Sequence, residues 1–186
     1  MNWNKHYKLE GHHSILSASD YHWLNDDDEK LEARINSYLA RQRGTRLHEL
    51  AKRLIEERVR LARTKQTLNL YVNDAIGYGM TPEVVLSYSD DFFGTADAIC
   101  FRDDKLRIHD LKTGKTQASF KQLLIYAGLF CLEYGYKPNE IETELRIYQN
   151  DDKQIYIPEP DEISYVQARI LSATKLIRKV NDGYEL

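Results

Sequence analysis

The chain has 186 residues, of which 42% are hydrophobic, and its formal net charge is −3 at pH 7. This length gives one well-packed domain and leaves no room for a second domain of ordinary size. The bulk charge gives no support to nucleic-acid binding, so a basic surface must be a local patch. Two cysteines, Cys100 and Cys131, are too few for a zinc ribbon or a disulfide framework, and they favour a reducing compartment, the cytoplasm. No apolar run approaches ~18 residues and the N-terminus lacks an apolar signal region, so we expect neither secretion nor a membrane span.

The first 40 residues are expected to form a helical N-terminal arm that packs on this single domain of residues 1–186. Several histidines lie in this arm and could be taken for a metal site. His12 and His13 are adjacent, however, and cannot share a helix face, so solvated histidines are the better interpretation.

Two helices are expected before Gly44. Ser17 or Ser19 can cap a short helix that continues to Trp23. Apolar residues at helical spacing then predict a helix over residues 28–43, which Gly44 is expected to break.

A second apolar stripe after Gly44 predicts another helix, reaching to about Ala62. His48 lies about 100° around this helix from Leu47, beside the stripe, so it can point into a cleft at the edge of the core. A lone histidine in such a place is more often structural. The stripe consists of Leu47, Leu50, Ala51, Leu54, Ile55, Leu61 and Ala62.

The segment 41–65 is the one markedly basic part of the chain, with three glutamates among its basic residues. Its composition fits a surface that contacts phosphates. It also fits a solvated helix face with i,i+4 ion pairs, such as Glu49 with Arg53, and the sequence leaves both interpretations open. The basic residues are Arg41, Arg43, Arg46, Lys52, Arg53, Arg58, Arg60, Arg63 and Lys65.

The middle of the chain predicts strands. Residues 64–80 have mixed character, and their glycines indicate a turn. A strand is expected over 83–88, and it would pair with a β-hairpin made of residues 96–101 and 106–111.

The remaining elements alternate between helix and strand. A long helix is expected over 117–134, two strands over 140–148 and 154–157, and a last helix over 161–180. This order predicts an α/β fold, with a mixed central β-sheet flanked by helices.

The predicted hairpin brings two acids and a lysine together. Side chains alternate along a strand, so Asp110 and Lys112 share one face, and Asp97 lies on the neighbouring strand. Two carboxylates aimed at one point repel each other unless a cation lies between them, and oxygen ligands suit Mg²⁺ or Mn²⁺. Such a site can activate a water for phosphodiester hydrolysis while the lysine stabilises the transition state. The alternative is a surface hairpin whose acids merely face solvent.

Four motifs in this order resemble the PD-(D/E)xK nuclease superfamily, specifically its RecB-like exonuclease branch. The resemblance covers residues 44–130 and is carried by GTRLH ending at His48, GTAD ending at Asp97, DLKTG beginning at Asp110, and QLLIYA beginning at Gln122. No proline precedes the first acid, and the cysteine quartet that binds an iron–sulfur cluster in some relatives is absent.

The resemblance implies a restriction-endonuclease-like core and a metal-dependent deoxyribonuclease, more often an exonuclease, acting in DNA recombination, repair or phage DNA processing. It implies His48, Asp97, Asp110 and the backbone of Leu111 as metal ligands, with Lys112 as catalytic residue beside Asp97 and Asp110. Glu83 stands where relatives often have an acid, although the sequence gives it no role. The residues expected to contact the substrate are Gln122, Tyr126, Arg43, Arg46, Arg53 and Lys115.

The expected cofactor is Mg²⁺ or Mn²⁺, and the expected partner is DNA. No ATP-binding motif is present, because His109 replaces the glycine that a Walker motif would need before Gly114, so a helicase or recombination partner would be another chain. A homo-oligomer is compatible with the sequence. Two alternatives remain: a binding module on the same fold that does not cut, and a phosphatase-like hydrolase that uses the same metal.

Overall fold

The computed structural model describes residues 4–9, 11 and 14–183, so the predicted solvated pair His12 and His13 lies outside the described residues. The chain divides into two compact units, residues 1–46 and 47–186. The expectation of one domain over the whole length therefore stays a prediction.

The first unit contains the 3-10 helix η1 (Tyr21–Asn25) and the N-terminal part of the long helix α1 (Asp28–Glu56). The short helix predicted from Ser17 through Trp23 therefore begins later than expected and is not α-helical. Ion pairs of the Arg34 guanidinium with Asp20 and Asp26, at 3.0 and 2.9 Å, hold η1 to the start of α1.

Helix α1 corrects two sequence predictions. It runs through Gly44 without a break, because a glycine inside a helix costs only about 1 kcal/mol relative to alanine and its neighbours favour the helix. It also ends at Glu56 and does not continue to Ala62. Residues 57–66 form a loop whose backbone groups bond to side chains of the next helix.

That next helix, α2 (Thr67–Tyr78), was missed by the prediction of mixed structure over 64–80. Gly79 ends it in the left-handed conformation, with φ of +65°, which a glycine adopts without strain. Tyr71, Val72 and Ala75 form its buried face, and this tertiary burial, which local sequence does not reveal, stabilises the helix.

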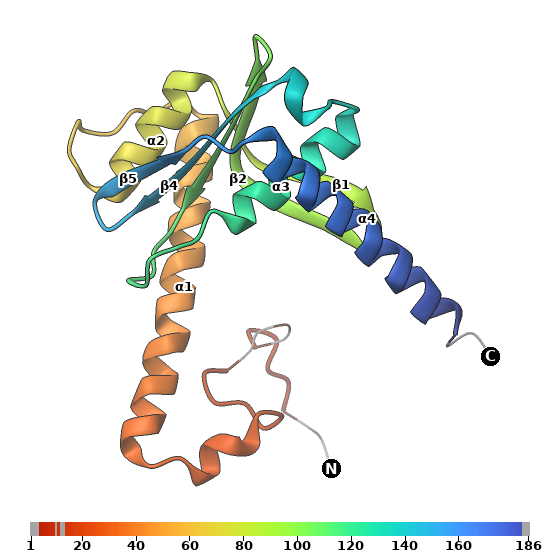
Figure 1. Cartoon of the computed structure of the whole chain (residues 1–186). Helices are drawn as coiled ribbons and strands as arrows, with labels where there is room; N and C mark the ends of the chain where they lie inside the picture. Colours follow the sequence, from red (N-terminus) through yellow and green to blue (C-terminus); the bar gives the residue numbers. More distant parts are fainter. Residues whose placement is uncertain (1–3, 10, 12–13, 184–186) are drawn as a thin grey trace. The chain divides into compact units, whose positions relative to one another are not determined.

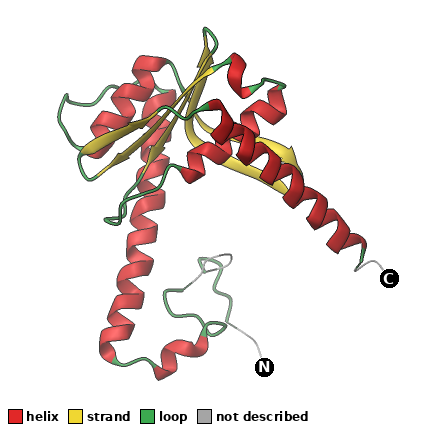
Figure 2. Ribbon diagram, in the orientation of Figure 1, coloured by secondary structure: helices red, strands yellow, loops and turns green. Residues whose placement is uncertain are grey.

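A mixed sheet of five strands, in the order β1-β2-β3-β4-β5, confirms the predicted α/β class. Neighbouring strands are antiparallel except β3 and β4, which are parallel, and Figure 2 shows the twisted sheet in yellow. The strands are β1 (Thr81–Ser89), β2 (Phe92–Arg102), β3 (Lys105–Leu111), β4 (Glu142–Gln149) and β5 (Asp152–Tyr156).

The parallel pair needs a crossover, which the helix α3 (Lys121–Tyr134) and the 3-10 helix η2 (Pro138–Glu140) provide between β3 and β4. Helix α3 begins at Lys121 and not at the predicted Gln117, because the side chain of Gln149 binds the backbone of the preceding loop at Thr116 and Ala118. The last helix, α4 (Pro160–Asp182), agrees with its prediction within two residues.

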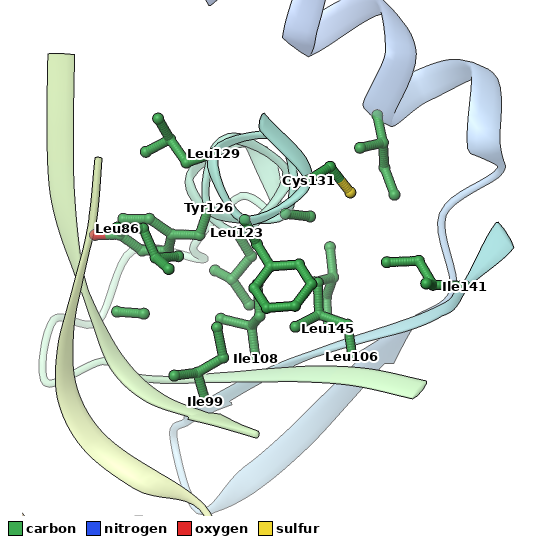
Figure 3. Close-up of a cluster of buried hydrophobic side chains, with 14 of the residues drawn as sticks. Leu86, Ile99, Leu106, Ile108, Leu123, Tyr126, Leu129, Cys131, Ile141 and Leu145 are labelled. Atoms are coloured by element: carbon green, nitrogen blue, oxygen red, sulfur yellow. The ribbon is translucent and has the colours of Figure 1, made fainter. Parts of the chain in front are cut away.

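Helices cover both faces of the sheet (Figure 1). On one face α3 packs against β1 to β4, and α4 packs on α3. Figure 3 shows the core beneath α3, where Leu106, Ile108 and Leu145 of the sheet meet Leu123 of the helix. On the other face α2 and residues 47–56 of α1 bury a second cluster: Ala51, Ile55, Tyr71, Val72, Ala75, Met80, Ala98, Leu111 and Tyr148.

Strand β2 changes faces at Asp97. Ala96 belongs to the cluster beneath α3, whereas Ala98 belongs to the cluster beneath α2. In a regular strand, residues two apart lie on the same face. The β1–β2 ladder pairs Pro82 with Ala98 and resumes at Val84 with Ala96, which omits the residues between them. The sheet is therefore irregular at Asp97.

Among the helices built from the described residues, none combines the length and the apolar composition that a membrane span requires.

The core beneath α3 yields a first prediction. Ile108 is fully buried in the central strand β3, so Ile108→Ala should leave a cavity and destabilise the protein by about 2–5 kcal/mol. Ile155 on β5 is 51% exposed, and Ile155→Ala is the matched control, with an expected cost of less than about 1 kcal/mol. Urea unfolding, monitored by circular dichroism, measures the free energy of unfolding of both variants. Equal decreases for the two variants would contradict this core assignment.

Candidate functional site

Four chain segments of the second unit bring ionisable side chains together near the end of β3. α1 contributes His48, β1 contributes Glu83, β2 contributes Asp97, and β3 contributes Asp110. The motif resemblance implies a ligand set of His48, Asp97 and Asp110, whereas the group of possible ligand atoms in the described residues consists of His48, Glu83 and Asp97.

Asp97 is the centre of the group. Its Oδ2 accepts a hydrogen bond from the backbone N–H of Leu111 at 2.8 Å and lies 3.4 Å from Nδ1 of His48. The hydrogen bond to Asp97 raises the pKa of His48, against the opposing effect of burial, and Glu83 and Asp110 add to the rise. One carboxylate oxygen thus joins the helix to both strands of the hairpin.

Glu83 belongs to the same group. Possible ligand atoms of His48, Glu83 and Asp97 all lie within 4.8 Å of one another. Burial raises the pKa of Glu83, and the negative charge of Asp97 raises it further. Its φ is +53°, in the left-handed region that residues other than glycine adopt at a cost of about 1–3 kcal/mol. Such strain persists only where surrounding structure imposes it, and here it accompanies three converging ligand groups.

Asp110 lies beside this triad and is only 2% exposed. Burial, together with the charge of Asp97, raises its pKa to about 6. Its Oδ2 is 3.1 Å from Nζ of Lys112 and has no well-aligned hydrogen bond to any described residue. A buried carboxylate with an incompletely satisfied oxygen is a position that a cation would stabilise.

A chain of contacts holds Lys112. Its Nζ donates to Oε1 of Gln122 at 2.8 Å, and Nε2 of Gln122 donates to the hydroxyl of Tyr126 at 2.9 Å. The Tyr126 ring lies directly against Gly94, where an added Cβ would be 2.8 Å from a ring carbon. The glycine of one motif therefore provides the space for the tyrosine of another.

Sequence reasoning missed three parts of this site: the place of Glu83, the reason for Gly94, and Tyr71. Tyr71 is buried on α2, and burial followed by the charges of Asp97, Glu83 and Asp110 raises its pKa well above the usual value. The motif resemblance marks Glu83 and Gly94 without giving a structural reason for either, and it does not mark Tyr71, because each depends on strand register or on packing between distant segments.

Two of the predicted substrate-binding residues lie in the site, and the other four are exposed residues outside it. Gln122 and Tyr126 lie in the site, as described above. Lys115 is exposed in the loop between β3 and α3, and its carbonyl accepts a hydrogen bond from Nδ2 of Asn150. Arg53 is exposed on the part of α1 in the second unit. Arg43 and Arg46 are exposed residues of the first unit.

The donor set fits a hard divalent cation. Carboxylate oxygens and one imidazole nitrogen suit Mg²⁺ or Mn²⁺ better than they suit metals that prefer sulfur. Neither cysteine is among these ligands, and burial raises the pKa of both thiols. The arrangement can hold a cation, and it places Lys112 beside it.

Comparisons of the chain with known protein families, with curated proteins and with solved structures found no match.

The triad predicts metal binding that involves Glu83. Mn²⁺ should raise the melting temperature of the wild type, since a ligand that binds only the native state stabilises it by mass action. Asp97→Asn with Asp110→Asn should remove this shift, and Glu83→Gln should weaken Mn²⁺ binding by about tenfold or more. Glu142→Gln, which changes an exposed acid on the same sheet, is the control. Calorimetric titration that finds wild-type Mn²⁺ affinity in the Asp97/Asp110 double variant would show that the site is misassigned.

The contact between Gly94 and Tyr126 predicts a coupled pair. Gly94→Ala should destabilise the protein by about 1–3 kcal/mol, because the new methyl group displaces the ring. Gly77→Ala is the control, since a Cβ there meets nothing within 4 Å and the helix should become slightly more stable. In a double-mutant cycle, Tyr126→Ala should relieve most of the cost of Gly94→Ala. Additive losses of unfolding free energy would contradict this packing.

Proposed function

We propose that the chain is a Mg²⁺- or Mn²⁺-dependent deoxyribonuclease, more specifically an exonuclease, on a restriction-endonuclease-like core of the PD-(D/E)xK type. The observation that carries the proposal is the pairing of Lys112 with Asp110 beside the His48, Glu83 and Asp97 triad. The motif resemblance, which is carried by several of the same residues, also supports it.

Four side chains would hold the metal: His48, Asp97 and Asp110, with Glu83 as an additional ligand or a hydrogen-bond partner of a bound water. The backbone of Leu111 adjoins them through its hydrogen bond to Asp97. When bound, a divalent ion supplies charge that lowers the pKa of a water and neutralises a phosphoryl oxygen.

The remaining chemistry belongs to Lys112. Its ammonium group lies 3.1 Å from Asp110 and is held on its other side by Gln122, so its position is fixed before a substrate arrives. In this position it can orient the attacking water and stabilise the negative charge that grows on the phosphoryl oxygen in the transition state. Tyr126 orients Gln122 through the second hydrogen bond of the chain.

The proposed substrate is DNA, with basic side chains contacting its phosphates. Arg43, Arg46, Arg53 and Lys115 are the contacts that the sequence suggests, and all four are exposed. A helicase or recombination protein would be a separate chain. A non-cutting binding module on this fold would need neither Asp110 nor Lys112, and both are present.

Lys112 separates a cutting enzyme from a binding module. Lys112→Ala should slow hydrolysis by about 10²-fold or more, because the lost charge acts most strongly in the transition state. Its affinity for DNA in Ca²⁺ should stay within a few fold of wild type. Lys175→Ala, which removes an exposed lysine on α4, should change neither quantity.

Single-turnover cleavage of linear and circular DNA, with Mg²⁺, Mn²⁺ or chelator, measures the rate and the dependence on ends. Equal cleavage by wild type and Lys112→Ala would disprove the assigned role. If the wild type cleaves neither DNA nor RNA with either metal, the binding-module alternative takes the place of the enzyme.

A further inference from the structure

The loop 57–66 and helix α2 line a concave site that shares no residue with the carboxylate cluster, which is formed by Glu83, Asp97 and Asp110. Its volume is about 550 Å³, within the range of about 300–1,000 Å³ that is usual for ligand pockets. It is lined by Arg60, Arg63, Thr64, Lys65, Asn69, Leu70, Asn73 and Asp74.

Two asparagines of α2 fix the backbone of this loop. Asn73 accepts a hydrogen bond from the N–H of Leu61 at 2.9 Å and donates one to its carbonyl at 3.0 Å. Asn69 donates to the carbonyl of Ala62 at 3.0 Å and to the hydroxyl of Thr64 at 2.9 Å. The bonded residues Leu61, Ala62 and Thr64 lie between the cationic residues of the loop in the sequence. The backbone that carries the basic side chains is therefore held in place.

These cations lack counter-charges. Arg60, Arg63 and Lys65 are exposed, and none forms an ion pair with an acid in the described part of the chain. The one acid of the pocket, Asp74, already has cationic partners elsewhere: Lys153 lies 2.9 Å and Arg146 3.2 Å from its Oδ2. The pocket therefore presents three cations that have no acidic partner among the described residues, which favours the binding of an anion.

Hydrogen bonds link the chain segments of the pocket and of the carboxylate cluster to one turn of the sheet. The N–H of Lys112 donates to the carbonyl of Tyr148, near the end of β4. In the turn that follows, Asn150 donates to the carbonyl of Lys115, while Oδ1 of Asp151 accepts the N–H of Thr67 at 2.9 Å. The loop of Lys115 and the N-terminus of α2 are thus fastened to one turn, with Lys65 only two residues before Thr67.

We propose that this pocket binds phosphate groups of the same nucleic-acid strand whose scissile phosphate lies at Lys112. The proposal rests on the proposed nuclease function and deepens it, because a site for distant phosphates selects a polynucleotide over a small phosphate ester. Arg60, Arg63 and Lys65 bind the backbone phosphates without reading bases, and exposed Lys115, whose carbonyl is bonded to Asn150 of the same turn, can add a further cation.

The test compares two triple variants that remove the same charge. In the pocket variant Arg60, Arg63 and Lys65 become Gln; in the control variant Arg169, Lys175 and Arg178 on α4 become Gln. Binding of a labelled single-stranded oligothymidylate of about 20 nucleotides is measured in Ca²⁺ at several salt concentrations. Cleavage of a thymidine dinucleotide with Mn²⁺ is measured on the same preparations, and circular dichroism monitors folding.

The pocket variant should bind the long oligonucleotide about tenfold or more weakly, and its salt slope should fall by about 2, the effect of losing about three contacts to single-strand phosphates. Dinucleotide cleavage should stay unchanged. The control variant should match the wild type in both assays. Arg63→Gln alone should give about a third of the change in slope, which keeps the test valid if the triple variant folds poorly.

Wild-type affinity and slope in the pocket variant would overturn the proposal, and an equal loss in the control variant would do the same. Saturable binding of inorganic phosphate by the wild type, without loss of oligonucleotide affinity in the pocket variant, would also overturn it in favour of a small-anion site. If the wild type cleaves nothing while the pocket variant still loses affinity, the nuclease function fails and the phosphate pocket stands.

Discussion

One carboxylate oxygen, Oδ2 of Asp97, takes over the pairing of β2 with β3 where their backbone ladder stops. The ladder ends at Ala98 with His109, and beyond it the N–H of Leu111 donates to the Asp97 side chain. A side chain that replaces a backbone acceptor keeps the Leu111 N–H paired beyond the last residue pair of the ladder. The same oxygen contacts His48, so the helix, the end of the ladder and the charged cluster all depend on this one group.

The nearness of three carboxylates to one another has an electrostatic cost. The charge of Asp97 raises the pKa of Glu83 and of Asp110, in addition to the larger effect of burial. Lys112 is the only cation in ion-pair contact with these acids among the described residues, apart from His48 when protonated. Like charges at this distance destabilise the folded chain unless a cation neutralises them. The positive φ of Glu83 is a further cost at the same place. Two costs that coincide at one site, with ligand groups converging there, are typical of function and are unusual in a purely structural hairpin.

Much of the second unit could be predicted from local sequence patterns. Alternation located the hairpin, and helical periodicity located α3 and α4. The missing parts depend on distant contacts: α2 is stabilised by burying Tyr71, and the end of α1 is set by asparagines that bond to the following loop. Glu83 stayed without a role for the same reason, since only strand register places it opposite Asp97. The alternation of side chains along β2 does not predict this placement, because β2 changes faces at Asp97.

The net charge of −3 is a sum over the whole chain and does not show where charges of one sign gather. Glu83 and Asp110 lie close enough to Asp97 for its charge to raise the pKa of both, while the cations of loop 57–66 are exposed and form no ion pair within the described chain. A phosphate backbone that approaches this chain meets attraction at the loop and repulsion at the acids, and a divalent cation reverses the repulsion. Under the proposed function, metal binding and strand binding should therefore reinforce each other: the cation would remove the field that opposes the phosphate, and the phosphate would add oxygen ligands to the cation. This reciprocal coupling follows from charge placement alone and needs no movement of the fold.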